Sequence, residues 1–552
     1  MKKKISQNRP LLNVFLTLFW ILAYFVSPIA LNPIYSGSAW TLLIVITSYI
    51  LINSLPLIGK LNQNLNTSAI TKEKVDVSPI LKTAKNRIII LAIVWILFIV
   101  INIASTALFN YKAYRDQFGT FVETEFSDDV QLVDLNQVPV VDKQLAKTLA
   151  DRKLGEDPGL GSQVFVGEPV IQQINGELVW AVPLHHSGFF MWLNNIEGSH
   201  GYIKVSATDQ NDIELIKKPI KYQPSSYFFD DIDRWVRILQ GKLTNGLTDY
   251  SFEIDDNGNA YWILTTYKNK WLFSLPEATG VITLNATTGE VSQYDINNVP
   301  SWVDRVQPES YIFNQLDNQG KYVHGIFNFS NKDKFMTSDS SAIVYNEGSC
   351  YLFTGLTSVG ADESAIGFVM VNMKTKESKF YQISGATEYA AMLSAQGAVQ
   401  QYGYRATAPI IINNNGIPTY FITLKDNSGL IKQYAFVSVE NVTIVGVGDT
   451  INAALRDYNS DLGATNTFVQ DDGKVLTLTG SIIRIGSQAD KFGEVFNLII
   501  EGAENTIFYA PQDLSQELSL SQNGDSVEIT YNESKNSYVK VNTFDNLLFE
   551  QK

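Results

Sequence analysis

The sequence predicts an α+β protein with three N-terminal transmembrane helices, tandem units of one helix followed by an antiparallel sheet, and a small all-β C-terminal barrel. Three observations predict it: three long apolar runs without charged residues, a helix-then-strand pattern that occurs four times, and five short strand segments near the C-terminus. The predicted parts are a membrane domain (1–110), a linker (111–141), four repeat units (142–229, 230–299, 300–385 and 386–460, the last with a connector helix) and the barrel (470–552).

The three apolar runs are Leu11 to Leu31, Ala39 to Ile58 and Ile88 to Phe109. Each is close to the roughly 20 residues that a helix needs to cross the hydrocarbon core. Unpaired backbone groups are costly in lipid, so runs of this purity are expected to be helices. A signal peptide would explain the lysines before the first run, but that run is too long and two more follow it. We therefore expect it to be an anchor.

Basic residues predict how the helices are oriented. They cluster before the first run and between the second and third, whereas the link 32–38 has none. Basic residues favour the cytoplasmic side, so the N-terminus and the loop 59–87 should be cytoplasmic. Residues from about 111 to 552 should then be extracytoplasmic, in a multi-pass cell-membrane protein. The runs contain no acidic or basic side chain that could carry ions, which favours an anchor or a surface for partner helices.

The charge is divided between the membrane part and the rest. Residues 1–109 carry ten Lys or Arg and two acidic residues, a net charge of +8. Because the whole chain has a net charge of −14, the remaining chain carries a net charge of −22. A surface this acidic repels phosphate backbones, which argues against a nucleic-acid partner. The single cysteine, Cys350, permits no intrachain disulfide and is expected to be a small buried core residue.

Helix signals open each of the four repeat units. Asp142 is a good N-cap for the first helix, Asp231 precedes the second, and Thr387 precedes the fourth. The third is expected from about Ser301, split or kinked at Pro308. Apolar residues at helical spacing predict the buried faces. They are Leu145, Ala146 and Leu149; Ile232, Trp235, Val236 and Leu239; Trp302, Val303 and Val306; and Tyr389, Met392 and Leu393.

Strand pairs follow the helices. Tyr250 to Ile254 and Tyr261 to Thr266 flank an Asn-Gly turn signal, and a similar pair flanks Asn413 to Gly416. A strand opened by glycine then closes each unit. These glycines are Gly201, Gly280, Gly367 and Gly429.

The stretch Gly280-Val-Ile-Thr-Leu-Asn-Ala-Thr-Thr-Gly289-Glu-Val resembles the final strand, turn and strand of PepSY-type modules of bacterial envelope proteins. The resemblance covers residues 230–296 best. This chain has Asn285 where that family often has Asp, and the first and fourth units lack the Thr-Gly-Glu turn. The resemblance implies an extracytoplasmic fold and, in some members, peptidase regulation. It transfers no catalytic residue.

The five C-terminal strand segments predict a small OB-like barrel, with an edge-paired sandwich as the alternative. They run 475–485, 495–500, 506–509, 526–531 and 538–544. Acidic neighbours such as Glu501 and Glu528 argue against the oligonucleotide role of many such barrels.

No residue is assigned a catalytic, cofactor-binding or metal-binding role. His185 and His186 are adjacent on a predicted strand and should point to opposite faces, which disfavours a shared ion. The loop Asp255 to Asn259 resembles a calcium loop but lacks its final Glu, so a plain hairpin turn is favoured. Glu253 and Asp255 have the spacing for acid and base work on one strand face, although acidic surface strands often contain such pairs.

Two aromatic-rich pieces could form a contact surface for a sugar or a peptide, with packing between repeats as the alternative. Their residues are Phe189, Phe190, Trp192, Trp262 and Trp271. The sequence thus favours a noncatalytic membrane-anchored envelope protein that binds or regulates a surface protein or cell-wall component. A subunit of an oligomeric channel or transport assembly with an outer cap is the alternative, and an outer-face hydrolase is a minor one. No cofactor is expected, and a homo-oligomer stays open.

Overall fold

The structure is a computed structural model that describes residues 9–71, 77–130, 138–224, 226–346, 348–359, 365–383, 385–464, 475–490, 493–532 and 538–549. The chain divides into two compact units. The first contains residues 1–123, 137–338 and 343–380, and the second contains 124–136, 339–342 and 381–552. Each unit is described by itself. The predicted α+β class is confirmed, while the domain boundaries given above stay predictions.

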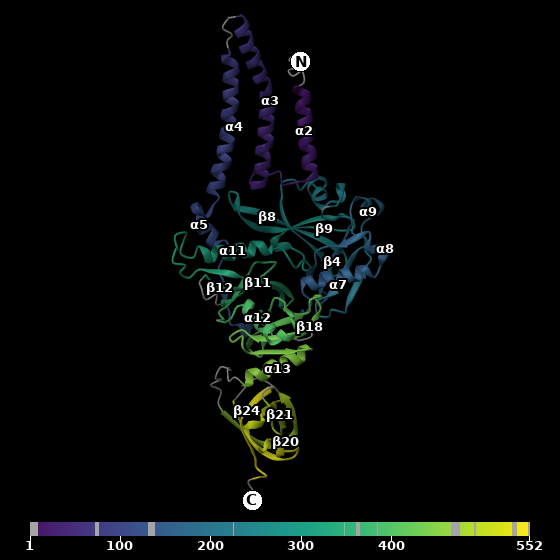
Figure 1. The fold of residues 1–552 in the computed structure, drawn as a ribbon, viewed down its shortest axis with the longest axis vertical. Coiled ribbons are helices and arrows are strands. Elements are labelled where there is room, and N and C mark those ends of the chain that lie inside the picture. The colour runs from purple at the N-terminus through teal and green to yellow at the C-terminus, as the bar shows by residue number, and fades with distance from the viewer. Residues whose placement is uncertain are drawn as a thin grey trace. The chain divides into compact units, whose positions relative to one another are not determined.

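Three helices open the first unit: α2 (Arg9–Val26), α3 (Ser36–Thr71) and α4 (Ser78–Ala104) (Figure 1). The segment Ser36–Leu55 and the whole of α4 are long and apolar enough to cross a membrane, whereas the apolar part of α2, Pro10–Val26, is shorter. The expectation of three equally clear spans is therefore corrected. Helix α2 ends five residues before the predicted Leu31, because Pro28 disfavours helical backbone at the residue before it and lacks an amide to donate.

Polar side chains bind each other between these helices. Trp20 Nε1 donates to Ser48 Oγ at 3.1 Å, and Trp95 Nε1 donates to Thr47 Oγ1 at 3.1 Å. No residue of α4 is buried. A core helix of a soluble protein would instead be covered, so the exposed apolar faces indicate membrane association. Exposed side chains on α2 and α4 include Leu11, Phe15, Leu18, Leu22, Ile88, Ile93, Ile96 and Val100.

The first sheet has the order β2-β4-β5-β6, with β3 also paired to β4. Asp142 caps the preceding helix by accepting from Leu145 N at 2.8 Å, and the predicted face of that helix is buried, as expected. The elements are α7 (Lys143–Gly155), α8 (Pro158–Gly161), β2 (Val164–Val166), β3 (Val170–Ile174), β4 (Glu177–His186), α9 (Phe189–Asn194), β5 (Tyr202–Ser206) and β6 (Ile213–Ile216).

The second sheet is antiparallel, in the order β10-β9-β8-β7. The predicted helix starts after Asp231 but changes to a π-helical turn at Trp235, which leaves the predicted face residue Leu239 exposed. Gly280 has φ +153°, and a Cβ there would lie 2.0 Å from Tyr294 O, so this strand pair requires glycine. The elements are η1 (Phe228–Asp230), α10 (Ile232–Arg234), η2 (Trp235–Leu239), β7 (Gly246–Ile254), β8 (Ala260–Trp271), β9 (Ser274–Asn285), β10 (Val291–Asp295) and η3 (Ile296–Asn298).

The third sheet has the order β1-β14-β13-β12-β11, with β1 parallel to β14. Its helix begins at Glu309 and not near Ser301, because Pro308 has extended backbone and serves as the N-cap residue. Val303 and Val306 are nevertheless buried beside Ile263 and Val281. The elements are α5 (Ala107–Asp116), β1 (Val122–Glu123), α11 (Glu309–Lys321), β11 (Phe335–Asn346), β12 (Ser349–Ser358), β13 (Ala365–Asn372) and β14 (Ser378–Tyr381).

The fourth sheet has the order β15-β17-β18-β19, with β16 paired to β17. Thr387 caps the preceding helix, as predicted. The predicted apolar face is wrong: Tyr389 is 63% exposed, and the helix packs on the sheet through the small residues Ala391 and Ala395, which allow close approach. The elements are α6 (Phe126–Asp129), α12 (Glu388–Ala398), η4 (Gln400–Tyr402), β15 (Arg405–Ala406), β16 (Ile410–Asn414), β17 (Ile417–Lys425), β18 (Ile431–Ser438), β19 (Val445–Gly448) and the connector helix α13 (Ile451–Ala464).

The last five strands close into a barrel in the order β20-β21-β22-β24-β23, which confirms the barrel over the sandwich. β22 and β24 are parallel, and the other neighbours are antiparallel. The elements are β20 (Val475–Asp490), β21 (Gly493–Ile500), β22 (Ile507–Pro511), η5 (Gln512–Leu514), η6 (Leu518–Leu520), β23 (Ser526–Asn532) and β24 (Tyr538–Asn546).

Candidate functional site

The loop that joins α2 to α3 lies against the second sheet. Leu31 N donates to Leu243 O at 2.6 Å. The hydroxyl of Tyr35 donates to Tyr267 O at 2.9 Å and accepts from Gly246 N at 3.1 Å. Because backbone groups of the sheet bind the loop directly, the loop forms a fixed wall beside the sheet.

The second sheet and its helix also bind the ends of two N-terminal helices. Arg234 Nε donates to Phe25 O at 2.8 Å, and its Nη2 lies 3.4 Å from Val26 O. Trp271 Nε1 donates to Ala104 O at 3.0 Å. The last carbonyls of a helix have no partner within it, so these side chains satisfy groups that would otherwise need water. The ends of α2 and α4 are therefore attached to the sheet.

A pocket of about 450 Å³ lies between that loop and the second sheet. Residues 28–30 and 35–38 form one wall, and side chains from α10, η2, the β7–β9 segment and α11 form the other. Four tyrosines contribute to the lining: Tyr35, Tyr250, Tyr267 and Tyr311. The volume is within the range of pockets that hold small ligands.

The tyrosines present neutral hydroxyl groups to this pocket. Burial raises the pKa of Tyr250, Tyr267 and Tyr311, so all three stay protonated near neutral pH. Tyr250 OH donates to Asp233 Oδ1 at 2.8 Å. A tyrosine hydroxyl has one hydrogen and two lone pairs, so Tyr250, whose hydrogen is directed to Asp233, can still accept a hydrogen bond from a ligand hydroxyl.

The charged side chains in the pocket are paired with each other. Arg237 Nε lies 3.1 Å from Asp233 Oδ1, and Arg237 Nη1 donates to Asn245 O at 2.8 Å. Arg237 is only 5% exposed. Asp233 is the only carboxylate among the described lining residues, and no histidine lines the pocket there to activate Ser36 or Ser38. The site is therefore suited to binding a neutral polar group.

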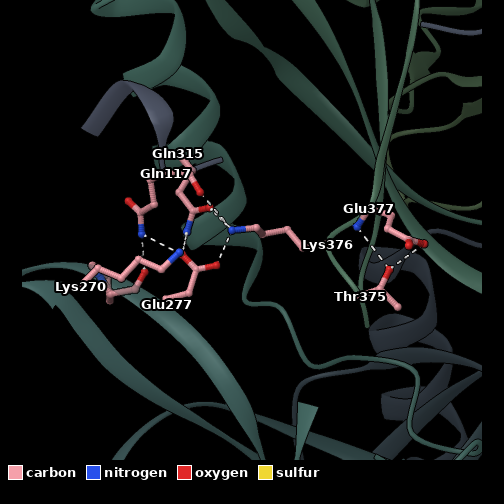
Figure 2. A network of polar contacts seen from close by, with 8 residues as sticks. Gln117, Lys270, Glu277, Gln315, Thr375, Lys376 and Glu377 are labelled. Atoms are coloured by element: carbon pink, nitrogen blue, oxygen red, sulfur yellow. Dashed lines mark hydrogen bonds and ion pairs between the residues drawn. The ribbon is translucent and has the colours of Figure 1, made fainter. Parts of the chain in front are cut away.

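A network behind the pocket holds β9 in place (Figure 2). Pro276 lines the pocket, and the next residue, Glu277, forms ion pairs with Lys376 and Lys270. Gln117 Nε2 donates to Glu277 Oε2 at 3.1 Å, and Lys376 Nζ donates to Gln315 Oε1 at 3.1 Å. The network thus links β9 to α11, to the β13–β14 turn and to the segment after α5.

Two carboxyl groups are buried deeper in the same unit. Glu253 accepts from Ser251 Oγ at 2.9 Å and from Asp304 N at 3.0 Å, and Asp304 Oδ2 accepts from Tyr345 OH at 2.9 Å. Burial, with a contribution from Asp304, raises the pKa of Glu253 to about 8. Burial also raises the pKa of Asp304. The partner of Glu253 is therefore Asp304, which the sequence did not indicate.

Asp255, which the sequence paired with Glu253, does not share its site. Its Oδ1 accepts from Asn257 N at 3.0 Å and from Asn259 N at 2.7 Å, so the carboxylate closes its own turn. Asp255 follows the last residue of β7, and strand alternation no longer applies there. This geometry is that of the plain hairpin turn favoured over a calcium loop.

His185, His186 and His324 have different surroundings. His185 Nδ1 lies 3.3 Å from Gln223 Oε1, and burial lowers the pKa of His186 to about 4. His324 Nε2 lies 2.6 Å from Asp333 Oδ2. Among the residues that the structure describes, no group of three or more His, Cys, Asp or Glu could hold a metal ion. Cys350 is buried, as predicted, and burial raises its pKa to about 12.

The five predicted contact residues lie in three places. Phe189 and Phe190 are exposed on α9, with Trp192 buried behind them. Trp262 is buried in the core of the second sheet and donates to Tyr222 O at 2.8 Å. Trp271 binds the end of α4. The tyrosine pocket was not predicted, because its residues come from segments up to 283 positions apart, from Pro28 to Tyr311.

Comparisons with known proteins identify no family. No family model and no curated protein match the chain. Solved structures that are weakly similar to the chain include two carotenoid-oxygenase structures. One is a chimera based on an apocarotenoid oxygenase, with 10% identity, a TM-score of 0.14 and 52% of each chain covered. The other is a variant of the Synechocystis apocarotenoid oxygenase, with 7% identity, a TM-score of 0.14, and coverage of 69% of this chain and 65% of that one. The chain thus spans 52% and 65% of their lengths, and similarity this low supports no functional conclusion.

Proposed function

We propose that this chain is a noncatalytic, multi-pass membrane protein of the cell envelope that binds a cell-wall component through its extracytoplasmic part. The tyrosine pocket is the proposed binding site, and its ligand is a neutral sugar unit. The observation that carries this proposal is a pocket of about 450 Å³ whose polar lining consists of neutral groups, four tyrosines with Ser36, Ser38 and Asn269, and one internally paired Asp–Arg couple.

The chemistry of the lining favours a sugar over an ion or a fatty acyl chain. A sugar presents hydroxyl groups at its edge and C–H groups on its faces. The hydroxyls of Tyr250 and Tyr311 would bind the sugar hydroxyl groups, and their aromatic rings would pack against the C–H groups. An anion would find the Arg237 charge already paired with Asp233. An acyl chain would leave the polar groups of the pocket without hydrogen bonds, which is costly.

The proposal includes three spans, with the N-terminus and the α3–α4 connection in the cytoplasm. Helix α2 supports this because it binds α3 through Trp20 and Ser48 and presents an exposed apolar surface like that of α4. Its 18 residues correspond to about 27 Å of helix, close to the thickness of the hydrocarbon core. PepSY-like modules remain part of the proposal, supported by the four sheets that each follow a helix.

Sugar binding can be tested with the full chain in detergent micelles. The probe is a neutral amino-sugar disaccharide from bacterial cell wall, titrated by calorimetry. Tyr311→Phe removes one hydroxyl and should weaken binding about two- to tenfold, the equivalent of about 0.5–1.5 kcal/mol for one hydrogen bond. Tyr389→Phe changes an exposed tyrosine outside the pocket and should bind like the wild type. Wild-type protein that binds no neutral sugar would contradict the proposal.

The orientation can be tested with single added cysteines, because the native Cys350 is buried. Tyr389→Cys should react with a membrane-impermeant maleimide in intact cells. Lys82→Cys, in the first turns of α4, should react only after the membrane is permeabilised. The opposite pattern would reverse the proposed orientation, and reaction of both in intact cells would exclude it.

A further inference from the structure

The first unit exposes a continuous apolar patch beside the end of α2. We call it the aromatic patch. It consists of Phe189, Phe190 and Leu193 on α9 and Phe228 and Phe229 on η1. Phe190 is 71% exposed and Phe228 is 55% exposed. Helix α9, Phe-Phe-Met-Trp-Leu-Asn, contains no charged residue. Single exposed apolar side chains are ordinary, but a contiguous group of this kind indicates a binding surface.

The patch is held in a fixed arrangement. Trp192 is buried beneath it, with ring centroids 5.6 Å from Phe189 and 5.7 Å from Phe228. Trp192 Nε1 donates to Asp230 Oδ2 at 2.8 Å. Rings packed this way lose little freedom when a partner covers them, so binding costs little ordering entropy.

The backbone also favours an external partner. Phe228 has φ +49°, in the left-handed region that bulky residues rarely adopt. Its side chain is mostly exposed, so burial within the protein does not compensate for this strain. Arg234 holds this conformation by donating to Phe228 O, and backbone strain that the surroundings maintain is concentrated at functional sites.

The patch is continuous with the end of α2. The Phe229 ring lies 5.5 Å from the ring of Phe25, in a T-shaped contact. Arg234 connects the two segments because it donates to Phe25 O at 2.8 Å and to Phe228 O at 2.9 Å. Figure 1 shows α9 at the end of the unit that carries the helices. If α2 spans the bilayer, the patch therefore lies at the depth where α2 leaves the hydrocarbon core.

We propose that the aromatic patch inserts into the outer leaflet of the same bilayer that the N-terminal helices cross. This inference rests on the proposed membrane topology and adds an interfacial contact to it. Aromatic side chains favour this depth, where their rings contact acyl chains and headgroups. The strongly acidic outer chain would be repelled by anionic lipid, so insertion depends on apolar contact and not on lipid charge. The contact would hold the extracytoplasmic part of the first unit against the membrane and fix the position of the pocket relative to the bilayer.

Lipid-attached quenchers test the proposal in full-length protein reconstituted into phosphatidylcholine nanodiscs. Phe190→Cys carries an environment-sensitive fluorophore, and the buried Cys350 gives little background. A nitroxide near the headgroup end of the acyl chain should quench this label severalfold more than a nitroxide near the bilayer centre. A label at Glu177→Cys, which is exposed in the same unit at the opposite end of β4 from α9, should respond much less to either lipid. An unquenched Phe190 label would overturn the proposal.

A label at Ile96→Cys, on the exposed face of α4, separates this proposal from the membrane topology itself. Quenching at Ile96 without quenching at Phe190 would overturn only the patch insertion, and no quenching at either position would overturn both. A second copy of the chain is the competing occupant. In that case the Phe190 label would be shielded from water but not quenched by either lipid. Light scattering would show a dimer that Phe190→Ser converts to a monomer. This result would also overturn the proposal.

Discussion

The barrel and the second sheet are both built from antiparallel strands, but they bury different side chains. The barrel core is a single apolar cluster that includes Leu498, Phe508 and Ile529. The second sheet and the helical segment before it bury Glu253 and Arg237, respectively, as well as aromatic residues. Burying charged groups is unfavourable unless they are paired, so a sheet selected for stability alone would resemble the barrel.

The difference indicates that the second sheet has a role in addition to stability. The buried polar groups Asp525 and Asn546 of the barrel bind each other at 2.9 Å and close its end. Beside the second sheet, Arg237 lines the pocket, whereas Glu253 binds Ser251 Oγ and Asp304 N away from it. We infer that the second sheet has exchanged stability for contact, whereas the barrel has not.

The largest expected effect is the loss of a large side chain from the barrel core. Phe508 is fully buried, and Phe508→Ala should destabilise the barrel by about 3–5 kcal/mol through lost burial and a residual cavity. Hydrogen exchange measured on the full chain should then increase in peptides from residues 475–549 and stay unchanged in residues 246–295. An equal increase in both regions would show that they unfold together, which would contradict the comparison.

A smaller effect is expected when the buried cation of the second sheet is removed. Arg237→Ala removes the donor to Asn245 O and leaves Asp233 with only the Tyr250 hydroxyl, and should cost about 2–3 kcal/mol because Asp233 is partly solvated. Thermal unfolding in detergent would measure it. The matched control, Lys204→Ala, breaks the more exposed pair with Glu177 and should cost less than about 0.5 kcal/mol. Equal effects would mean that the buried pair has no special role.

The buried carboxyl of Glu253 should make stability depend on pH. Burial raises its pKa in the folded state to about 8, above the ordinary value of 4.5 for a glutamate, so the folded state binds the proton more tightly. Stability should then decrease as pH rises from about 5 to 8. Glu253→Gln removes the titrating group, and the stability difference between wild type and variant should change by at least about 1 kcal/mol, one pKa unit, across that range. Parallel melting curves from pH 5 to 9 would contradict this account.

The sequence predicted those elements whose signals are local. Asp142 and Thr387 cap helices because an N-cap bond joins residues three positions apart, and the barrel strands follow from short-range alternation. The buried face of α12 was mispredicted because the aromatic residue Tyr389 was counted among the apolar residues of the buried face. The helix packs closely on the sheet through Ala391 and Ala395 instead. The third helix begins about two turns later than predicted, because Pro308 has extended backbone and serves as its N-cap residue.

The candidate site could not be predicted in the same way. Arg237 and Tyr311 gave no signal, because the pocket forms only when a loop before residue 39 meets the second sheet. Asp304 was missed because its segment was expected to be helical, so its carboxylate was not placed near Glu253. By contrast, Phe189 and Phe190 could be named as contact candidates because an aromatic-rich piece is visible in the sequence itself, and their role as a contact surface stays a prediction.

The smallest expected effect concerns the attachment of α4. Trp271→Phe keeps the aromatic ring but removes the donor to Ala104 O, and water can reach part of this site. The cost should therefore be that of one hydrogen bond, about 0.5–1.5 kcal/mol in thermal unfolding. Ser105→Ala, which removes the hydroxyl acceptor for Phe273 N at 3.1 Å, should have a similar effect. If the double variant loses clearly less than the sum of the two single variants, the β8–β9 hairpin and the end of α4 form one cooperative contact, because each single variant already loses the shared coupling. Additive losses would mean that each bond forms independently, and the contrast with the barrel would then depend on the pocket alone.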